Sequence, residues 1–173
     1  AVTGLNPPSE LVRLLWEATI TQNGGFFLYY FDSNTRSGLP SRIFNDKEVD
    51  ELLILDIQAS RQGRSPDFEV IARLAAECFM PLGYGGGVSN RGTAAQLFDR
   101  GVEKVIVNTA CLEEQGVIQD IAVDWGTQAV IAAIDVLPTP DDLLVFDHRR
   151  GQATSLDVLD HVVDASMLVL ARS

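Results

Sequence analysis

The chain contains few of the residues that would support a disulfide scaffold or a metal site. It has two cysteines, Cys78 and Cys111, and two histidines, His148 and His161, among 173 residues. Both cysteines lie in apolar segments without metal-ligand spacing, which predicts buried thiols in a reducing compartment. Neither histidine has a partner at a spacing typical of a metal site or a catalytic triad, so both are expected at the surface. We therefore expect no metal and no resident cofactor.

Positive charge and long apolar runs are also scarce. The 13 Lys and Arg residues are outnumbered by 24 Asp and Glu residues, which gives a net charge of −11. This balance argues against a nucleic-acid-binding surface, although a few backbone N–H groups could still bind a phosphate locally. No basic segment precedes an apolar one, and no apolar run reaches the length of a membrane span. The sequence therefore predicts a cytoplasmic protein with no membrane partner.

Apolar segments typical of buried parallel strands alternate with amphipathic helical patterns along most of the chain. The expected strands cover residues 26–31, 52–57, 79–84, 104–108, 129–135 and 167–170. One expected helix starts at Pro66, with Ser65 as its N-cap, and others cover residues 91–100, 113–123 and 156–163. Near the start of the chain, a helix is expected after Ser9 and a short one at 43–49. Regular alternation of strand and helix is typical of right-handed βαβ units in a parallel sheet.

The pattern changes after the fifth expected strand. Two prolines, Pro138 and Pro140, precede a short apolar run at 143–146 and a turn at Arg150 and Gly151. These features predict a small β-hairpin inserted after the fifth strand. The predicted fold class is thus an α/β protein, a TIM-type (βα) barrel in one domain over residues 1–173, with residues 1–22 poorly assigned. With about six strands, and fewer than the ~250 residues typical of such barrels, it is expected to be incomplete.

Three consecutive glycines at the end of one expected strand are the most informative local feature. Gly85, Gly86 and Gly87 precede a helical pattern, so their N–H groups and the helix N-terminus could receive an anion. One interpretation is therefore a phosphate-binding turn. The alternative is a tight connection between strand and helix that binds nothing.

Polar residues stand where other expected strands end. Asp56, Asn108, Thr109 and Asp135 each follow an apolar run, and the carboxyl ends of barrel strands carry the chemistry of this architecture. Asn108 and Thr109 could donate to a phosphate held by the glycines. Asp135 is interpreted as a functional carboxylate. Asp56 is a candidate for substrate or phosphate binding, although Ser60 and the loop amides could instead satisfy it locally.

Several motifs resemble those of the cyclase subunit of imidazole glycerol phosphate synthase. They are found at residues 42–52, 55–60, 81–87, 101–105, 108–110 and 133–135. Their order and spacing fit that family, strongly from Arg42 to Asp135 and more weakly from there to Ser173.

The resemblance implies a (βα)8 barrel and a lyase of histidine biosynthesis. Such a subunit takes ammonia from a separate glutaminase subunit, then cyclises and cleaves a phosphorylated ribulosyl-aminoimidazole-carboxamide nucleotide. Two strand-end aspartates act there as general acid and base, and Asp135 matches the second of them. The residues that match one phosphate site are Gly86, Gly87, Asn108 and Thr109. Glu51 and Lys104 match charged positions where ammonia enters.

Two departures from the family pattern leave other functions open. Ile20 stands where the first catalytic aspartate is expected, and Leu28 where a loop lysine is expected. A paired acid/base mechanism needs two titratable groups, so Ile20 should impair cyclisation unless another carboxylate substitutes. The alternatives are a non-catalytic barrel that binds a phosphate or a glutaminase partner, and the sibling sugar-phosphate isomerase of histidine biosynthesis.

Overall fold

The structure is a computed structural model of the whole chain. It describes residues 26–31, 50–56, 58–59, 62–113, 116–138, 143–147, 150–157 and 167–171. Ile20, both histidines and the helices expected after Ser9 and at 43–49 lie outside the described residues. The expectations for those residues stay predictions.

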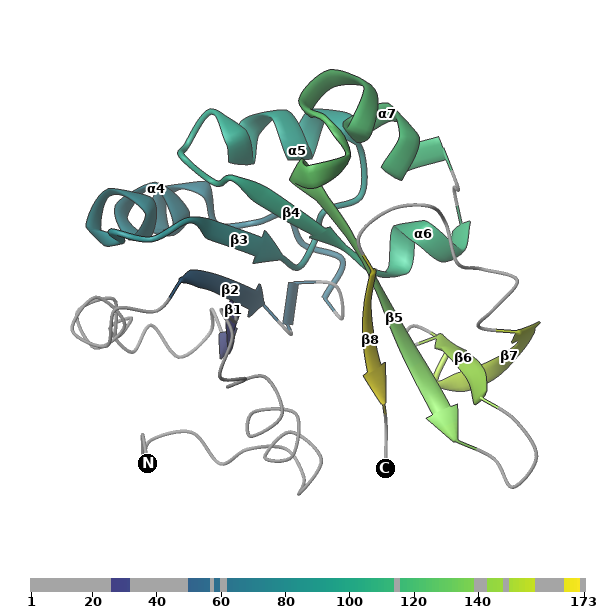
Figure 1. Ribbon diagram of the computed structural model, residues 1–173. Coiled ribbons are helices and arrows are strands. Elements are labelled where there is room, and N and C mark those ends of the chain that lie inside the picture. Colours follow the sequence, from purple (N-terminus) through teal and green to yellow (C-terminus); the bar gives the residue numbers. More distant parts are fainter. Residues whose placement is uncertain are drawn as a thin grey trace, which may run out of the picture.

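Six parallel strands form the main sheet. They are β1 (Phe26–Phe31), β2 (Glu51–Asp56), β3 (Leu82–Gly85), β4 (Lys104–Val107), β5 (Val130–Pro138) and β8 (Met167–Ala171). Each pairs with the next in the order β1-β2-β3-β4-β5-β8, as the sequence predicts (Figure 1). Within the described residues β1 and β8 do not pair, so this part of the sheet is open.

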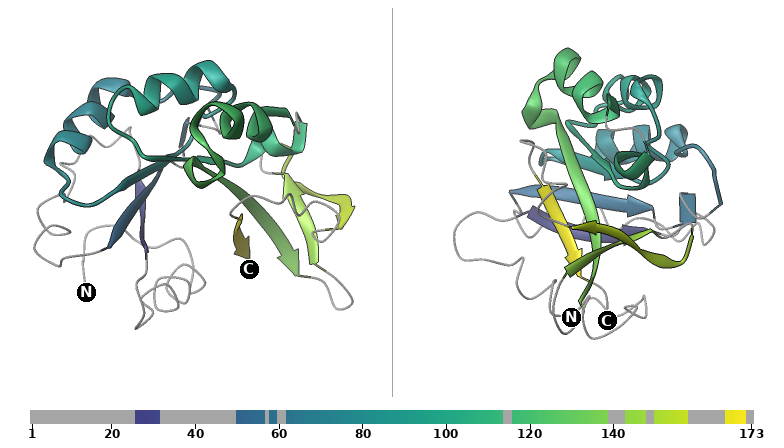
Figure 2. Two further views of the ribbon diagram at one scale, coloured as in Figure 1. Left: turned by 45° about the horizontal axis from the view of Figure 1, so that its top comes forward. Right: turned by 90° about the vertical axis from the view of Figure 1, so that its right-hand side faces the viewer.

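Helices follow the strands and gather on one side of the sheet. They are α4 (Phe68–Glu77), α5 (Arg91–Phe98), α6 (Thr109–Glu113) and α7 (Gly116–Trp125), with a short 3-10 turn at Thr127–Ala129. Figure 2 shows α4, α5 and α7 side by side above the sheet. The guanidinium of Arg91 forms an ion pair with the Asp124 carboxylate, and this pair joins the start of α5 to the end of α7. The arrangement is that of an open (βα) barrel.

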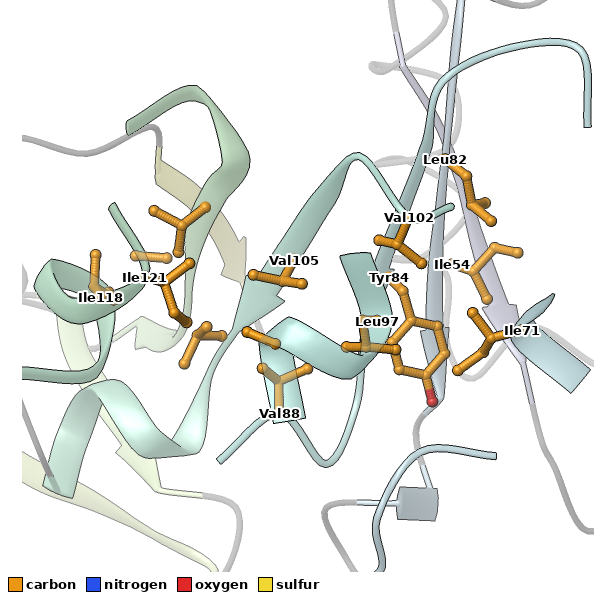
Figure 3. Packing of buried hydrophobic residues seen from close by; sticks show 14 of the residues in the cluster. Ile54, Ile71, Leu82, Tyr84, Val88, Leu97, Val102, Val105, Ile118 and Ile121 are labelled. Atoms are coloured by element: carbon orange, nitrogen blue, oxygen red, sulfur yellow. The ribbon is translucent and has the colours of Figure 1, made fainter. Parts of the chain in front are cut away.

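The two faces of the sheet are filled differently. Alternate strand residues such as Ile54, Tyr84 and Val105 point to the helices and pack among their apolar side chains, including Ile71 and Leu97 (Figure 3). The opposite face carries a smaller apolar cluster formed by Leu53, Ile106 and Ala133. Because side chains alternate along a strand, this division also assigns a face to each polar residue at a strand end.

A β-hairpin follows β5, as predicted. It consists of β6 (Leu143–Asp147) and β7 (Gln152–Asp157), and β6 pairs antiparallel with the last residues of β5. Val136 is paired with Ala171 of β8 and also with Val145 of β6. The two partners must therefore lie on opposite edges of β5, which places the hairpin on the edge used by β4, beyond the point where β4 ends.

Several predicted boundaries are wrong. β3 starts at Leu82 and not at Phe79, whose side chain is 88% exposed. Pro81 has no N–H to donate, and its carbonyl accepts from Leu52 where the pairing begins. Asp67, not Ser65, caps α4, because its carboxylate accepts from the Val70 N–H.

The helix predicted at 113–123 corresponds to α7 at 116–125, and the short helix α6 before it is not predicted from the sequence. The helix predicted at 156–163 is wrong at its start, because residues 156 and 157 belong to β7. A β-strand there completes the hairpin pairing, and that tertiary contact outweighs the local helical pattern.

Candidate functional site

The carboxyl end of β5 places a buried carboxylate next to an amide from β4. Asp135 is only 8% exposed and lies on the face opposite the helices, in alternation with Ile131 and Ala133. The side-chain amide of Asn108 donates to Asp135 Oδ2 at 3.1 Å and to the carbonyl of Ala133 at 2.9 Å. These bonds hold the Asp135 carboxylate in one orientation at the mouth of the sheet.

The same bonds change the role expected of Asn108. Both of its side-chain N–H groups are engaged, so neither points to a phosphate as the sequence predicted. Its Oδ1 accepts from the Thr109 hydroxyl at 3.3 Å. The side chain of Asn108, at the end of β4, therefore links Thr109 at the start of α6 to Asp135 in the neighbouring strand β5.

The glycine turn has a backbone that only glycine adopts readily. Gly86 has φ +120° and Gly87 has φ +68°. The register of β3 and β4 pairs Gly85 with Ile106, so the turn stands level with the residues leading to Asn108. The turn precedes α5, whose N-cap Asn90 accepts from the Thr93 N–H at 2.9 Å. The sequence-predicted neighbourhood of glycines, Asn108 and Thr109 is thus consistent with the strand register.

Asp56 lies at the end of β2 but on the other face. Asp56 lies on the same face of β2 as Leu52 and Ile54, which point to the helices. Its side chain is fully buried. Its Oδ1 accepts from the N–H groups of Gln58 at 3.0 Å and Ala59 at 3.2 Å. The loop amides satisfy this carboxylate, which is the local role that the sequence left open for Asp56, and the geometry does not support the phosphate-binding role.

Arg64 is a residue of this region that the sequence did not single out. Its guanidinium donates to Asp56 Oδ2 at 3.4 Å, and its side chain is 31% exposed. An arginine in a polar loop carries no signal of its own, and only the folded loop brings it back to the strand end.

The opposite end of the sheet carries an ion pair. Lys104 Nζ lies 2.6 Å from Glu51 Oε1, so β4 and β2 are joined across β3. Gly83 of β3 is paired with Lys104 and has no side chain in between. The two residues expected at the ammonia entrance are therefore in contact, at the amino ends of their strands.

The core next to Asp56 allows a test of the site's electrostatics. Burial, and then the negative charge of Asp56, raise the pKa of the Tyr84 phenol well above its ordinary value. Tyr84 thus stays neutral when folded, whereas in the unfolded chain it ionises near pH 10. The stability that this shift contributes is complete below pH 10 and is lost as the pH rises above it.

Relative to Tyr84→Phe, the native protein should lose about 1.4 kcal/mol of unfolding free energy for each pH unit above ~10. Urea unfolding of both proteins between pH 8 and 12 measures this difference. Groups that titrate in both proteins cancel in the comparison. Parallel pH profiles would show that Tyr84 ionises freely in the folded state.

Within the described residues, no cluster of three or more His, Cys, Asp or Glu side chains is arranged to hold a metal ion. In the same residues, no helix has both the length and the apolar character needed to cross a bilayer.

Parallel strands in chain order, an outer layer of helices and polar residues at the carboxyl ends define an α/β protein of the (βα)-barrel class. Residues 29–171 match the model of the family described as histidine biosynthesis protein. The chain belongs to this family.

The curated relatives are named as subunits of imidazole glycerol phosphate synthase. A Leptospira interrogans protein, provisionally named imidazole glycerol phosphate synthase subunit HisF, is 43% identical over 157 residues, which are 84% of this chain and 61% of that protein. A Pseudomonas aeruginosa protein, provisionally named subunit hisF2, is 52% identical over 54% of this chain and 38% of that protein. The imidazole glycerol phosphate synthase subunit HisF of Pelodictyon phaeoclathratiforme is 38% identical over 69% of this chain and 48% of that protein. This chain spans 38–61% of the length of these relatives.

Proposed function

We propose that this chain carries the cyclase chemistry of imidazole glycerol phosphate synthase. Its substrate would be a phosphorylated ribulosyl-aminoimidazole-carboxamide nucleotide, and ammonia from a glutaminase subunit would supply the nitrogen, in the cytoplasm. The observation that supports this most directly is the buried Asp135 carboxylate, held by Asn108 at the carboxyl end of β5. The relatives' names support the same reaction.

In this proposal the site divides its work among three groups. Asp135 exchanges a proton with the reacting substrate as a general acid or base, a role that needs a fixed geometry. The N–H groups of the Gly86–Gly87 turn receive a substrate phosphate. Asn108 orients Asp135 and links it to Thr109.

The test is turnover of that nucleotide by the full chain with ammonium salts as nitrogen donor, followed by product absorbance or chromatography. We expect saturable, slow turnover, because Ile20 leaves one acid/base position without a titratable group. Phosphate binding without any turnover would instead favour a second function, a non-catalytic barrel that binds a phosphate or a glutaminase partner. Ile20 is the observation that favours this second function.

The Glu51–Lys104 ion pair supports ammonia entry at the amino end of the sheet. Lys104→Met leaves the Glu51 carboxylate, only 18% exposed, without its partner at the amino end of the sheet. With a glutaminase subunit present, the ratio of glutamine-driven to ammonia-driven turnover should fall by about tenfold, the effect of roughly 1.4 kcal/mol on a barrier. Arg73→Met, on the exposed side of α4, is the control. A ratio that is unchanged in Lys104→Met would contradict an entrance at this pair.

A further inference from the structure

The loop after β2 is closed into a ring by four hydrogen bonds. The Asp56 carboxylate accepts from the Gln58 and Ala59 N–H groups, which fixes the start of the loop. The Arg64 N–H donates to the carbonyl of Ala59 at 2.9 Å, which closes its end. The Arg64 guanidinium then returns to Asp56 Oδ2 at 3.4 Å. We call Asp56, Gln58, Ala59 and Arg64 the Asp56 loop.

The glycine turn rests directly on this loop. A Cβ atom on Gly86 would lie 2.5 Å from the carbonyl oxygen of Asp56. A Cβ atom on Gly87 would lie 2.4 Å from the carbonyl oxygen of Arg64 and 3.4 Å from the Ala59 side chain. Since real Cβ atoms do not come so close, the two segments touch backbone to backbone, and a shift of the Asp56 loop must move the turn.

We propose that Asp56 and Arg64 are positioning residues that set the Gly86–Gly87 turn, and with it the N–H groups of the phosphate site, by holding the Asp56 loop in place. This inference rests on the proposed phosphate-binding function of the turn. Asp56 is unsuited to bind phosphate itself, because its carboxylate is an anion and its oxygens already accept from the loop and from Arg64. Its influence on the site is therefore mechanical.

Asp56→Asn separates positioning from simple electrostatics, because the two effects have opposite signs. Removing a negative charge near an anion site should by itself strengthen phosphate binding. Loss of the charged partner of Arg64 should instead loosen the loop and weaken binding. By calorimetry with inorganic phosphate, we expect the dissociation constant of Asp56→Asn to rise about tenfold, within the range of couplings between contacting residues.

Two further variants complete the binding experiment. Arg64→Gln should weaken phosphate binding to a similar degree, and the double variant should be no weaker than the weaker single variant, because both residues act through one contact. Arg73→Gln, whose guanidinium contacts only the carbonyl of Glu69 among the interactions described for it, should bind as the native protein does. Unchanged or tighter binding in Asp56→Asn, or fully additive losses, would overturn the proposal.

Amide hydrogen exchange of the ligand-free protein gives a readout that does not depend on phosphate. Peptides covering residues 84–90 should exchange faster in Asp56→Asn than in the native protein, while peptides of α7 should not change. If the native protein binds no phosphate, the proposed function of the turn fails, and the exchange data still decide whether Asp56 positions it. Equal exchange over 84–90 in both proteins would refute the positioning role.

Discussion

Asp135→Asn is expected to lower turnover with ammonia by about 10²–10⁴-fold, the usual contribution of a positioned acid or base. Asparagine keeps the volume of aspartate, and its Oδ1 can still accept from the Asn108 amide, so the local structure should survive. What is lost is the ability to take up and release a proton. The rate constant and the substrate concentration at half saturation should be measured separately, because the effect is expected in the former.

The matched control is Asp147→Asn in the hairpin. Asp147 is buried to a similar degree, at 5% exposure, and its carboxylate accepts from the Arg150 N–H within the β6–β7 turn. The same substitution there should change turnover little. Calorimetry with inorganic phosphate should show equal affinity for the native protein and Asp135→Asn. Turnover that is unaffected by Asp135→Asn would make Asp135 a structural residue and would contradict its role as the general acid or base.

Gly86→Ala is expected to reduce the free energy of unfolding by about 3 kcal/mol or more, and to abolish phosphate binding. Two costs add: φ +120° is unfavourable for an L residue, and the new Cβ would lie 2.5 Å from the carbonyl oxygen of Asp56. The backbone must therefore move, and the N–H groups of the turn move with it.

Gly63→Ala is the control that separates the two costs. Gly63 also has a positive φ, +61°, but a Cβ there would meet no atom within 4 Å. We expect a loss of only about 1 kcal/mol from the backbone conformation. Urea unfolding of the three proteins gives the comparison. Equal losses for Gly63→Ala and Gly86→Ala would show that the turn does not press on the Asp56 loop.

The order and direction of the parallel strands could be predicted because runs such as 52–55 and 105–107 are apolar on both faces. The same property hides which face each residue occupies. Asp56 and Asp135 both end apolar runs and look alike in the sequence, yet one points to the helices and the other away from them. In a strand that is apolar throughout, the sequence does not show which residues face which side of the sheet. The structure was therefore needed to place these two carboxylates on opposite faces.

The local sequence also did not identify the N-cap of α4, because two neighbouring residues could serve as the cap. Ser65 and Asp67 are both good N-cap residues, and Pro66 is suited to a first helical turn. The structure uses Asp67, while Pro66 packs near Gly87, where a Cβ would lie 3.4 Å from its Cδ. This proximity of Pro66 to Gly87 arises only in the folded chain, and no local pattern reports it.

The two glycines within β3, Gly83 and Gly85, leave space that side chains of β2 fill. A Cβ on Gly83 would lie 2.3 Å from Leu53 Cδ2, and one on Gly85 would lie 2.6 Å from Leu55 Cδ2. Leucines of β2 thus occupy the volume that β3 leaves open. A larger residue at position 83 could become established during evolution only together with a smaller one at 53. At position 85 a smaller residue at 55 would be needed as well as a shift of Ile106, whose Cβ would lie 2.9 Å from the new Cβ. Across related sequences, the side-chain volumes at 53 and 83, and those at 55 and 85, should therefore change in opposite directions, so that the total volume of each pair stays constant.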